Sequence, residues 1–363
     1  MLHIPVPCSR QRRQARMISI IILVHNKLEL TQRCLSALAG SVRNIDHEVL
    51  CIDQASTENV DALQDAASAF RRFRLIRNQK NLSFSVANNR AGAESSGDTL
   101  LFLNNDVMAA PGSVETLLAT LAEDPLNGIA GPKLVYPSGK VQHAGIAQML
   151  WGYVSNYGVG GDADDSRFQQ TCERFAITGA MACLPRAVFE RVGGFDERYS
   201  WGYEDVDLSL KVRAAGFRVL YVPEAESVHE ESATLSSLRN PGALAHNYQT
   251  YRASWDHELA QHEKAYINRL HESGVRRVVI LGMGQAASGL AGVLSKNGIE
   301  PLAFTSCLSG GPDSYCGRPA VSLESLRNTR FDRLVVGSQY FFEFEKAIRQ
   351  FDPAGAPIFP AVA

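Results

Sequence analysis

The sequence contains no apolar run that approaches the roughly 20 residues needed to cross a bilayer as a helix. Its longest run, Ile18–Val24, has the length of a buried strand instead. The net charge is only −2 over 363 residues, so no global field attracts the chain to nucleic acid or to anionic lipid. The sequence therefore predicts neither a membrane-spanning helix nor a nucleic-acid partner.

Cysteine forms no recognisable framework, because the count is odd and no two cysteines have C-x-x-C spacing. This pattern is typical of reduced intracellular thiols, and it disfavours both a disulfide scaffold and a zinc site. We therefore expect a cytoplasmic protein, and peripheral contact with the inner face of the cell membrane is left open. The seven cysteines are Cys8, Cys34, Cys51, Cys172, Cys183, Cys307 and Cys316.

Residues 1–16 contain four arginines but no apolar stretch that resembles the core of a signal peptide. We expect this segment to be a tail, either solvated or in weak contact with a membrane surface. Met17 stands directly before the first strand and is an alternative start of the chain. The arginines are Arg10, Arg12, Arg13 and Arg16.

Buried strands and amphipathic helices alternate through the first two-thirds of the chain. The length and the 45% apolar content are sufficient for two domains. The β-α-β-α-β order predicts a parallel sheet with helices on both faces, and Pro137-Ser138-Gly139 predicts a hairpin after it. The predicted strands are Ile18–Val24, Glu48–Ile52, Leu75–Ile76 and Thr99–Leu103, and the predicted helices are Leu28–Ala39, Val60–Phe70 and Ser85–Ala93.

A polar, helix-prone segment at 240–273 separates this unit from a second α/β unit. Its four histidines include no pair with i, i+4 spacing, so we expect a solvated linker helix rather than a metal site. A strand at Val275–Leu281 and a helix at Ala286–Asn297 begin the second unit. The predicted organisation is a tail at 1–16, a first domain at 17–239, a linker at 240–273 and a small domain at 274–363.

Three polar clusters stand directly after predicted strands of the first domain. Ligands of an open α/β sheet bind at the carboxyl ends of its strands, so we expect these clusters to converge on one site. Each carboxylate, taken alone, could equally cap a helix or a turn. The clusters are His25-Asn26, Asp53-Gln54-Ala55-Ser56 and Asn104-Asn105-Asp106.

Another cluster places three carboxylates within four residues at the start of a predicted helix. Acidic residues favour the positive end of a helix, but the aromatic residues beside them need burial or a ligand to stack on. His229 follows the predicted strand Arg218–Val222 and is a candidate metal ligand. The cluster is Trp201-Gly202-Tyr203-Glu204-Asp205-Val206-Asp207-Leu208.

In combination these motifs resemble the family 2 glycosyltransferases of the GT-A fold, in particular the rhamnosyltransferase-like bacterial branch that builds surface polysaccharides. The resemblance extends from about residue 18 to residue 232 and implies a mixed α/β sheet with helices on both faces. The matching motifs, besides the clusters above, are Ser19–Asn26, Ile52–Thr57, Asn88-Asn89-Arg90-Ala91-Gly92, Leu101–Asp106 and Gly193-Gly194-Phe195-Asp196-Glu197.

The resemblance implies a role for each matching residue. Asp205 would be the catalytic base, and Glu204 would orient it or the acceptor. Asp106 would bind Mg²⁺ or Mn²⁺, and His229 would reach the metal or the diphosphate. Because Asn104 replaces the first acid of the usual D-x-D motif and brings no charge, the metal would depend on the donor diphosphate as well. The residues expected to contact the nucleotide-sugar donor are Asn26, Asp53, Asn88, Asn104 and Asn105, with Asp53 on the base or ribose.

The C-terminal unit is similar to the small Rossmann-like domains attached to sugar-modifying enzymes. Gly282-x-Gly284-x-x-Ala287 lies between a predicted strand and a predicted helix, as a phosphate-binding turn does. Phe304-Thr305-Ser306 stands where an acidic residue is expected, which argues against an NAD-dependent enzyme. Ligand binding, assembly and simple packing all remain open as its role.

The sequence therefore predicts an inverting glycosyltransferase. It would move a sugar from a nucleoside-diphosphate donor, such as dTDP-rhamnose or a UDP-sugar, to a hydroxyl of a polysaccharide or lipid-linked glycan. One alternative is a sugar nucleotidyltransferase, which needs a glycine-rich triphosphate loop that His25-Asn26-Lys27-Leu28 lacks. Another is a non-catalytic nucleotide-sugar-binding regulator, which would not need the Glu204-Asp205 pair. The donor sugar, acceptor, linkage and oligomeric state are left open.

Overall fold

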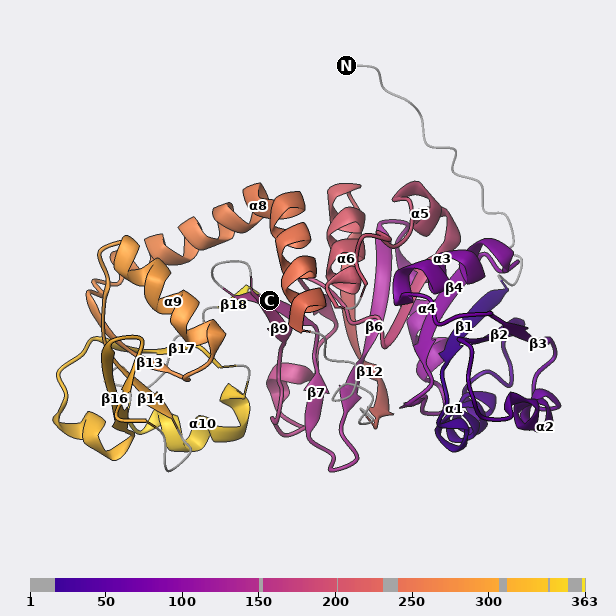
Figure 1. Cartoon of the computed structure of the whole chain (residues 1–363), viewed down its shortest axis with the longest axis horizontal. Coiled ribbons are helices and arrows are strands. Elements are labelled where there is room, and N and C mark those ends of the chain that lie inside the picture. Colours follow the sequence, from indigo (N-terminus) through magenta and orange to yellow (C-terminus); the bar gives the residue numbers. More distant parts are fainter. Residues whose placement is uncertain are drawn as a thin grey trace, which may run out of the picture.

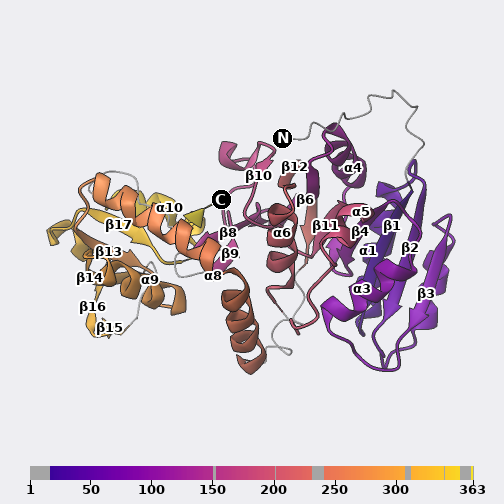
Figure 2. The same cartoon turned by 90° about the horizontal axis from the view of Figure 1, so that it is seen from above.

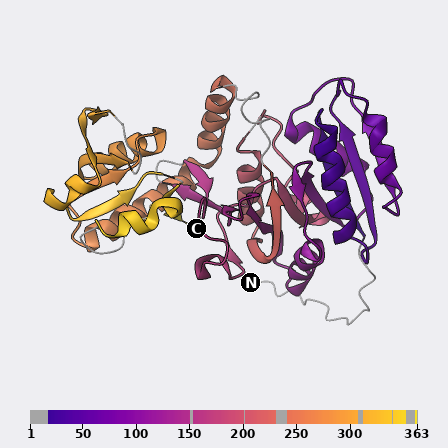
Figure 3. The same cartoon turned by 90° about the horizontal axis from the view of Figure 1, so that it is seen from below.

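The computed structural model describes residues 17–149, 153–200, 202–230, 241–306, 312–338, 340–351 and 361–362. Two α/β units lie at opposite ends of the molecule, and a long helix runs between them (Figure 1). Views from above and from below show the same separation of the two sheets (Figure 2, Figure 3). The predicted tail at 1–16 lies outside the described residues.

The first unit is built on a mixed sheet with the strand order β10-β12-β6-β11-β4-β1-β2-β3, in which β5 also pairs with β12 and β7 with β6. Its strands are β1 (Ile18–Val24), β2 (His47–Asp53), β3 (Phe73–Arg77), β4 (Thr99–Asn104), β5 (Val107–Met108), β6 (Asn127–Val135), β7 (Val141–His143), β10 (Cys172–Glu173), β11 (Met181–Pro185) and β12 (Arg218–His229). Its helices are α1 (Leu28–Ser41), η1 (Val60–Leu63), α2 (Gln64–Ala67), α3 (Phe84–Glu94), α4 (Ser113–Glu123), η3 (Ser166–Phe168), α5 (Arg186–Arg191) and α6 (Glu204–Ala214).

Side chains of the central strands alternate between two hydrophobic layers, because successive residues of a strand point to opposite faces. Ile20 and Ile22 of β1 pack with α1 and α4. Ile21 packs in the other layer, with α3, α5 and α6. The expectation of a sheet covered by helices on both faces is therefore confirmed.

Two local expectations were wrong in the first unit. Val60–Phe70 is not one helix, because a 3₁₀ turn at η1 precedes the single turn of α2. The strand predicted at Arg218–Val222 continues to His229, and it pairs with β5 at His229↔Val107. His229 is therefore fixed within a sheet instead of following it.

The helix predicted at 240–273 is present as α8 (Pro241–Glu272), but the expectation that it is solvated was wrong. Tyr251 and Leu259 are buried against the first unit. Tyr266 and Leu270 are buried against the second. The partner of the buried face changes from the first unit to the second along the 32 residues of α8, so no single apolar stripe marks the helix in the sequence. Within the part of the chain that the structure describes, no helix combines the length and the hydropathy needed to cross a membrane.

The second unit has the strand order β15-β16-β14-β13-β17, and its four longer strands run parallel. The second unit comprises β13 (Arg277–Leu281), α9 (Gln285–Lys296), β14 (Glu300–Ser306), β15 (Ser314–Tyr315), β16 (Arg318–Ser322), η4 (Glu324–Asn328), β17 (Arg333–Val336) and α10 (Phe341–Arg349). A salt bridge joins the two units, since Arg167 of η3 contacts Glu345 of α10 at 2.6 Å. A small third sheet is formed by β8 (Ile146–Met149), β9 (Val154–Asn156) and β18 (Ala361–Val362).

Candidate active site

The carboxyl ends of three neighbouring strands bring the predicted polar clusters to one edge of the first sheet. In the parallel register Val24 lies opposite Asp53, and Leu23 lies opposite Asn104. Strand pairing therefore places the segments after β1, β2 and β4 side by side, as the sequence predicted.

Asn26 organises the loop that follows Asp53. Both Asn26 and Lys27 have positive φ, near 55° and 52°, so the chain turns sharply after β1. The Asn26 side-chain oxygen accepts hydrogen bonds from the N–H groups of Thr57 at 2.8 Å and Glu58 at 3.3 Å. This side chain is engaged within the protein, and its contact with the donor stays a prediction.

Asp53 is buried at the end of β2, and its Oδ1 accepts the N–H of Ser56 at 2.9 Å. The next residue, Gln54, is also buried, and its Nε2 has no hydrogen-bond partner. Buried polar groups are normally paired, so an unpartnered amide beside a carboxylate is a signal of a missing polar ligand. Sequence reasoning gave Gln54 no role, because its burial follows from the fold.

Asp106 and His229 meet directly although 123 residues separate them in the chain. His229 Nε2 lies 3.0 Å from Asp106 Oδ1, and the two side chains are 12% and 13% exposed. On the other side of the ring, Nδ1 lies 2.7 Å from the Gln142 side-chain oxygen. Because that oxygen can only accept a hydrogen bond, Nδ1 carries a proton, and Nε2 is the ring nitrogen that faces Asp106.

This pair fits a divalent cation. The imidazole nitrogen and the carboxylate oxygen lie 3.0 Å apart, and both atom types are ligands of Mn²⁺ or similar ions. Gln142 supplies the second hydrogen bond that orients a metal-binding histidine. Among the described residues no group of three or more His, Cys, Asp or Glu side chains gathers to hold a metal. Further ligands would have to come from a bound diphosphate or from water.

Glu204 and Asp205 begin α6 after a turn with positive φ at Gly202 and Tyr203. Asp205 Oδ2 accepts the N–H of Gly179 at 3.0 Å, and its Oδ1 accepts the N–H of Val206 at 2.8 Å. The carboxylate is therefore held in one orientation by two backbone donors. Glu204 has one buried oxygen, Oε2, with no hydrogen-bond partner.

Burial raises the pKa of both carboxyl groups. It raises the pKa of Glu204 to about 8, to which the neighbouring Asp205 charge adds. Burial also raises the pKa of Asp205, whereas the N–H groups of Gly179 and Val206 oppose the rise. Glu204 therefore holds the proton of the pair near neutral pH, and Asp205 is the better ionised acceptor.

The segment Thr178-Gly179-Ala180 connects the base to the metal pair. β11 runs antiparallel to β4, with Met181 opposite Leu103. Ala180 accepts a hydrogen bond from the N–H of Asn104 at 2.8 Å, and Gly179 donates to Asp205. These two hydrogen bonds place the segment between the two clusters.

The loop before the base is held by α8. The rings of Tyr203 and Tyr251 lie 5.0 Å apart, and the Asn247 amide donates to the carbonyl of Gly202 at 2.9 Å. Asn247 and Tyr251 were missed in the sequence, where nothing in the polar segment at 240–273 distinguished them. Trp201, which the sequence placed in this cluster, lies outside the described residues.

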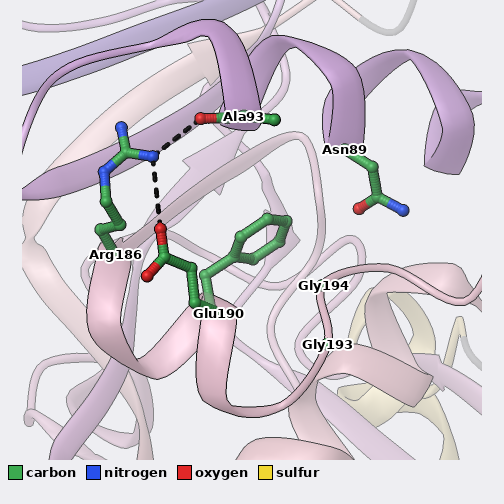
Figure 4. A pocket seen from close by; sticks show the side chains of 8 residues that line it. Asn89, Ala93, Arg186, Glu190, Gly193 and Gly194 are labelled. Carbon is green, nitrogen blue, oxygen red and sulfur yellow. Dashed lines mark hydrogen bonds and ion pairs between the residues drawn. The ribbon is translucent and has the colours of Figure 1, made fainter.

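Asn89 connects two of the matching motifs to each other. Its side chain accepts the N–H of Phe195 and donates to the carbonyl of Phe195, both at 2.9 Å, and it also donates to Glu197. Figure 4 shows Asn89 on α3 facing Gly193 and Gly194, beside the Arg186 and Glu190 pair of α5, around a pocket of about 290 Å³. Through these hydrogen bonds Asn89 fixes the loop that leads to the base.

Two of the remaining residues predicted to contact the donor, Asn88 and Asn105, have side-chain hydrogen-bond partners within the protein. Asn88 is 1% exposed, and its amide donates to the Phe84 carbonyl in α3. The Asn105 amide donates to the Thr31 hydroxyl, whereas Asn104 is partly exposed at the end of β4. The donor-binding roles of these three residues stay predictions.

Comparisons with known proteins agree with this geometry. A family model described as "Glycosyl transferase family 2" matches residues 19–193, and one described as "N-terminal domain of galactosyltransferase" matches residues 163–232. An N-acetylglucosaminyl-diphospho-decaprenol L-rhamnosyltransferase of Mycobacterium tuberculosis is 30% identical over 227 residues, which cover 56% of this chain and 73% of that protein.

Two other relatives are much longer than the matched region. The O-antigen biosynthesis protein RfbC of Myxococcus xanthus is 31% identical over 60% of this chain, and protein y4gI of Sinorhizobium fredii is 32% identical over 60%. The matches span only 17% and 25% of those two proteins. Among solved structures, GalNAc-T7 with UDP, GalNAc and Mn²⁺ superimposes with a TM-score of 0.55 and 16% identity, covering 79% of this chain and 56% of that one. This likeness is one of fold.

Proposed function

The chain belongs to glycosyl transferase family 2 and has the GT-A fold, and on this premise we propose that it transfers a sugar with inversion from a nucleoside-diphosphate donor to an acceptor hydroxyl. The observation that carries the proposal is the fixed carboxylate of Asp205. Two backbone N–H groups orient it, and through Gly179 and Ala180 it adjoins the strand that leads to Asp106.

The chemistry needs one base and one stabilised leaving group. Asp205 takes the proton from the acceptor hydroxyl as that oxygen forms a bond to the anomeric carbon. The bond from the anomeric carbon to the diphosphate oxygen breaks in the same step, and the electron pair leaves with the nucleoside diphosphate. Because the attack is opposite to the leaving group, the configuration inverts. Glu204, protonated near neutral pH, can donate a hydrogen bond to the acceptor.

Asp106 and His229 are the residues that would hold a divalent cation. When bound, such a cation supplies positive charge that neutralises the leaving diphosphate. Asn104 and Asn105 stand beside this pair, and Asp53 with Gln54 form the buried polar end of the site. We assign Asp53 to the ribose or base, since its free acceptor capacity matches hydroxyl and N–H donors.

The names of the relatives favour a lipid-linked or polysaccharide acceptor. A rhamnosyltransferase acting on a diphospho-decaprenol and an O-antigen biosynthesis protein both suggest cell-envelope synthesis. We accordingly propose dTDP-rhamnose or a UDP-sugar as the donor, and action in the cytoplasm at the inner face of the membrane.

A thermal-shift panel tests the donor proposal. UDP-, dTDP- and GDP-sugars are each added with Mn²⁺ and with EDTA, and a metal-dependent rise of Tm for one nucleotide class is expected. The stabilising sugar is then incubated with acceptor lipids, and release of the free nucleoside diphosphate is measured. Stabilisation without turnover on any acceptor would favour a binding regulator. Pyrophosphate release from a nucleoside triphosphate and a sugar phosphate would favour a nucleotidyltransferase.

A further inference from the structure

Asn247 of α8 holds the loop before the base with both ends of its side-chain amide. The side chain is fully buried. Its nitrogen donates to the Gly202 carbonyl at 2.9 Å, and its oxygen accepts the N–H of Ser200 at 3.4 Å. The two bonds lie on either side of position 201, so one amide fixes the chain before and after that residue.

The loop has a conformation that needs such support. Gly202 and Tyr203 have φ angles of +82° and +73°, in the left-handed region. A residue with a Cβ is strained there, and it stays there only where surrounding contacts hold it. The Tyr203 ring packs against the rings of Tyr251 and Tyr248, with centroids 5.0 and 6.0 Å away. Contacts from α8 therefore hold both residues of the strained turn.

This turn decides where α6 begins, and α6 carries the base. The Tyr203 carbonyl accepts the N–H of Asp207, so the first helical turn is built on the strained residue. No side chain caps α6 at this end. Asp205 is the second residue of α6, and its Oδ2 accepts the N–H of Gly179 at 3.0 Å. A shift of the turn would therefore move the carboxylate relative to Gly179.

One face of α8 supplies contacts to the loop and to α6. Asn247, Tyr251 and Trp255 follow one another at intervals of four residues, which places them in a row on the helix surface. Asn247 binds the loop, and Tyr251 packs on Tyr203. Trp255 donates to Asp207 of α6, which runs beside α8 (Figure 1). The row therefore follows the chain from the loop into the helix that carries the base.

We propose that Asn247 is a positioning residue for sugar transfer, because its amide sets the turn from which Asp205 projects. The inference rests on the proposed role of Asp205 as the base. Neither loop contact of Asn247 involves the segments after β1, β2 and β4, where the donor is predicted to bind. Loss of the amide therefore slows the chemical step and leaves donor binding intact, since a small misplacement of a reacting group has a large effect on rate.

Asn247→Ala removes both loop contacts, and Leu259→Ala is its matched control. Leu259 is buried on the same helix, about three turns further along, so its truncation also lowers stability. The pair of variants separates a loss of stability from a loss of position. The Tm of each variant is measured first, and all later comparisons are made well below it.

Hydrogen exchange of the Gly179 amide reports the position of Asp205 without any turnover. This N–H donates to the Asp205 carboxylate, which protects it while the carboxylate stays in place. Mass spectrometry follows the peptides that cover residues 176–181 and 202–207. We expect both peptides to exchange faster in Asn247→Ala and as in wild type in Leu259→Ala. Asp205→Ala removes the acceptor and gives the exchange rate of an unprotected Gly179.

Kinetics test the consequence for transfer. The donors are UDP-glucose and dTDP-rhamnose, each with Mn²⁺ and the acceptor lipid that supports turnover in wild type, and release of UDP or dTDP is measured. We expect kcat to fall about 10–100-fold in Asn247→Ala, whereas the Kd for UDP or dTDP stays within about 2-fold of wild type. In Leu259→Ala neither value should change.

Asn247→Asp separates the hydrogen bonds from the volume of the side chain. Burial raises the pKa of a carboxyl group, and the protonated form can donate to Gly202 and accept from Ser200 as the amide does. The ionised form has no donor. The ratio of variant to wild-type kcat should therefore rise as the pH falls from about 8 to about 6. The ratio is used because Glu204 and Asp205 titrate in both proteins. This variant also supplies the test if Asn247→Ala does not fold.

Three results would overturn the proposal. The first is a folded Asn247→Ala in which Gly179 exchanges as in wild type. The second is a fall in kcat no larger than that of Leu259→Ala, and the third is a fall in donor affinity as large as the fall in kcat. A pH-independent ratio for Asn247→Asp would also contradict it. Wild-type protein without turnover on any acceptor would count against the proposed function alone, because exchange at Gly179 still decides whether Asn247 positions Asp205.

Discussion

Trp255 Nε1 donates a hydrogen bond to Asp207 Oδ1 across 2.9 Å, and it thereby joins α8 to α6. Asp207 is 2% exposed, and Lys211 contacts its other oxygen at 3.2 Å. The third acid of the cluster at 204–207 is therefore a structural anchor. α8 therefore holds α6, the helix that carries the base.

Trp255→Phe should destabilise the protein, because it leaves Asp207 Oδ1 buried without its donor. The expected loss is about 1–3 kcal/mol in the free energy of unfolding, measured by urea denaturation. His257→Ala, an exposed change on the same helix, should stay within about 0.5 kcal/mol of wild type. Equal stability of the two variants would contradict the anchoring role.

Asp205→Asn should abolish transfer and leave donor binding nearly intact, because it removes the base and retains the shape of the side chain. We expect a fall in kcat of about 10²–10⁴-fold or more. Donor affinity is measured by calorimetry with Mn²⁺, with Asp106→Ala as the comparison. A loss of donor affinity as large as that of Asp106→Ala would contradict the assignment of Asp205 as the base.

Asp53→Ala should weaken the nucleotide irrespective of the metal, because Asp53 is assigned to the ribose or base. UDP or dTDP affinity is compared with Mn²⁺ and with EDTA, and both values should fall. Since Asp53 also accepts the Ser56 N–H, circular dichroism and Tm must first show that the variant is folded. An unchanged donor affinity in folded protein refutes the role.

His229→Ala should weaken the metal-dependent part of donor binding. We expect the affinity for UDP with Mn²⁺ to fall about 10–100-fold, the range found when metal-site partners are lost, with little change in EDTA. His246→Ala on the exposed side of α8 is the control. If Mn²⁺ enhances UDP binding equally in wild type and His229→Ala, the histidine is not a ligand.

Glu204→Gln should be more stable than wild type in alkaline solution. The pKa of Glu204 rises from 4.5 to about 8 on folding, so between these pH values the folded protein holds a proton that the unfolded chain has released. Wild-type stability contributed by this group is therefore full below about pH 4.5 and is lost as the pH rises through about 8. Because glutamine cannot ionise, the Glu204→Gln variant does not lose this stability as the pH rises.

The corresponding measurement is Tm against pH for both proteins. The curves should approach each other near pH 5 and separate by about 2 °C or more near pH 8.5, since about 1 kcal/mol moves Tm by about 2–4 °C in domains of this size. Parallel curves across the whole range would show that Glu204 titrates normally.

The sequence by itself determined the elements of the first sheet and the edge at which its polar clusters meet. The apolar run Ile18–Val24 and the run Thr99–Leu103 are long enough and apolar enough to specify buried parallel strands, and ligands bind where such strands end. Asp53 and Asp106 were placed at that edge by strand order alone. The alternation of strands and helices along the sequence predicts the parallel sheet in which β1 pairs with β2 and β4.

The contacts between distant segments were decided only by the tertiary structure. The Asp106–His229 pair depends on the extension of β12 to pair with β5, and the hold of Trp255 and Tyr251 on α6 depends on the docking of α8. Local periodicity reports which face of an element is apolar, but not which partner covers it or how deeply a polar side chain is buried. For that reason the sequence supplied the chemical groups of this site, whereas packing between segments that are distant in the chain, 48 residues apart for Asp207 and Trp255 and 123 for Asp106 and His229, decided how those groups pair.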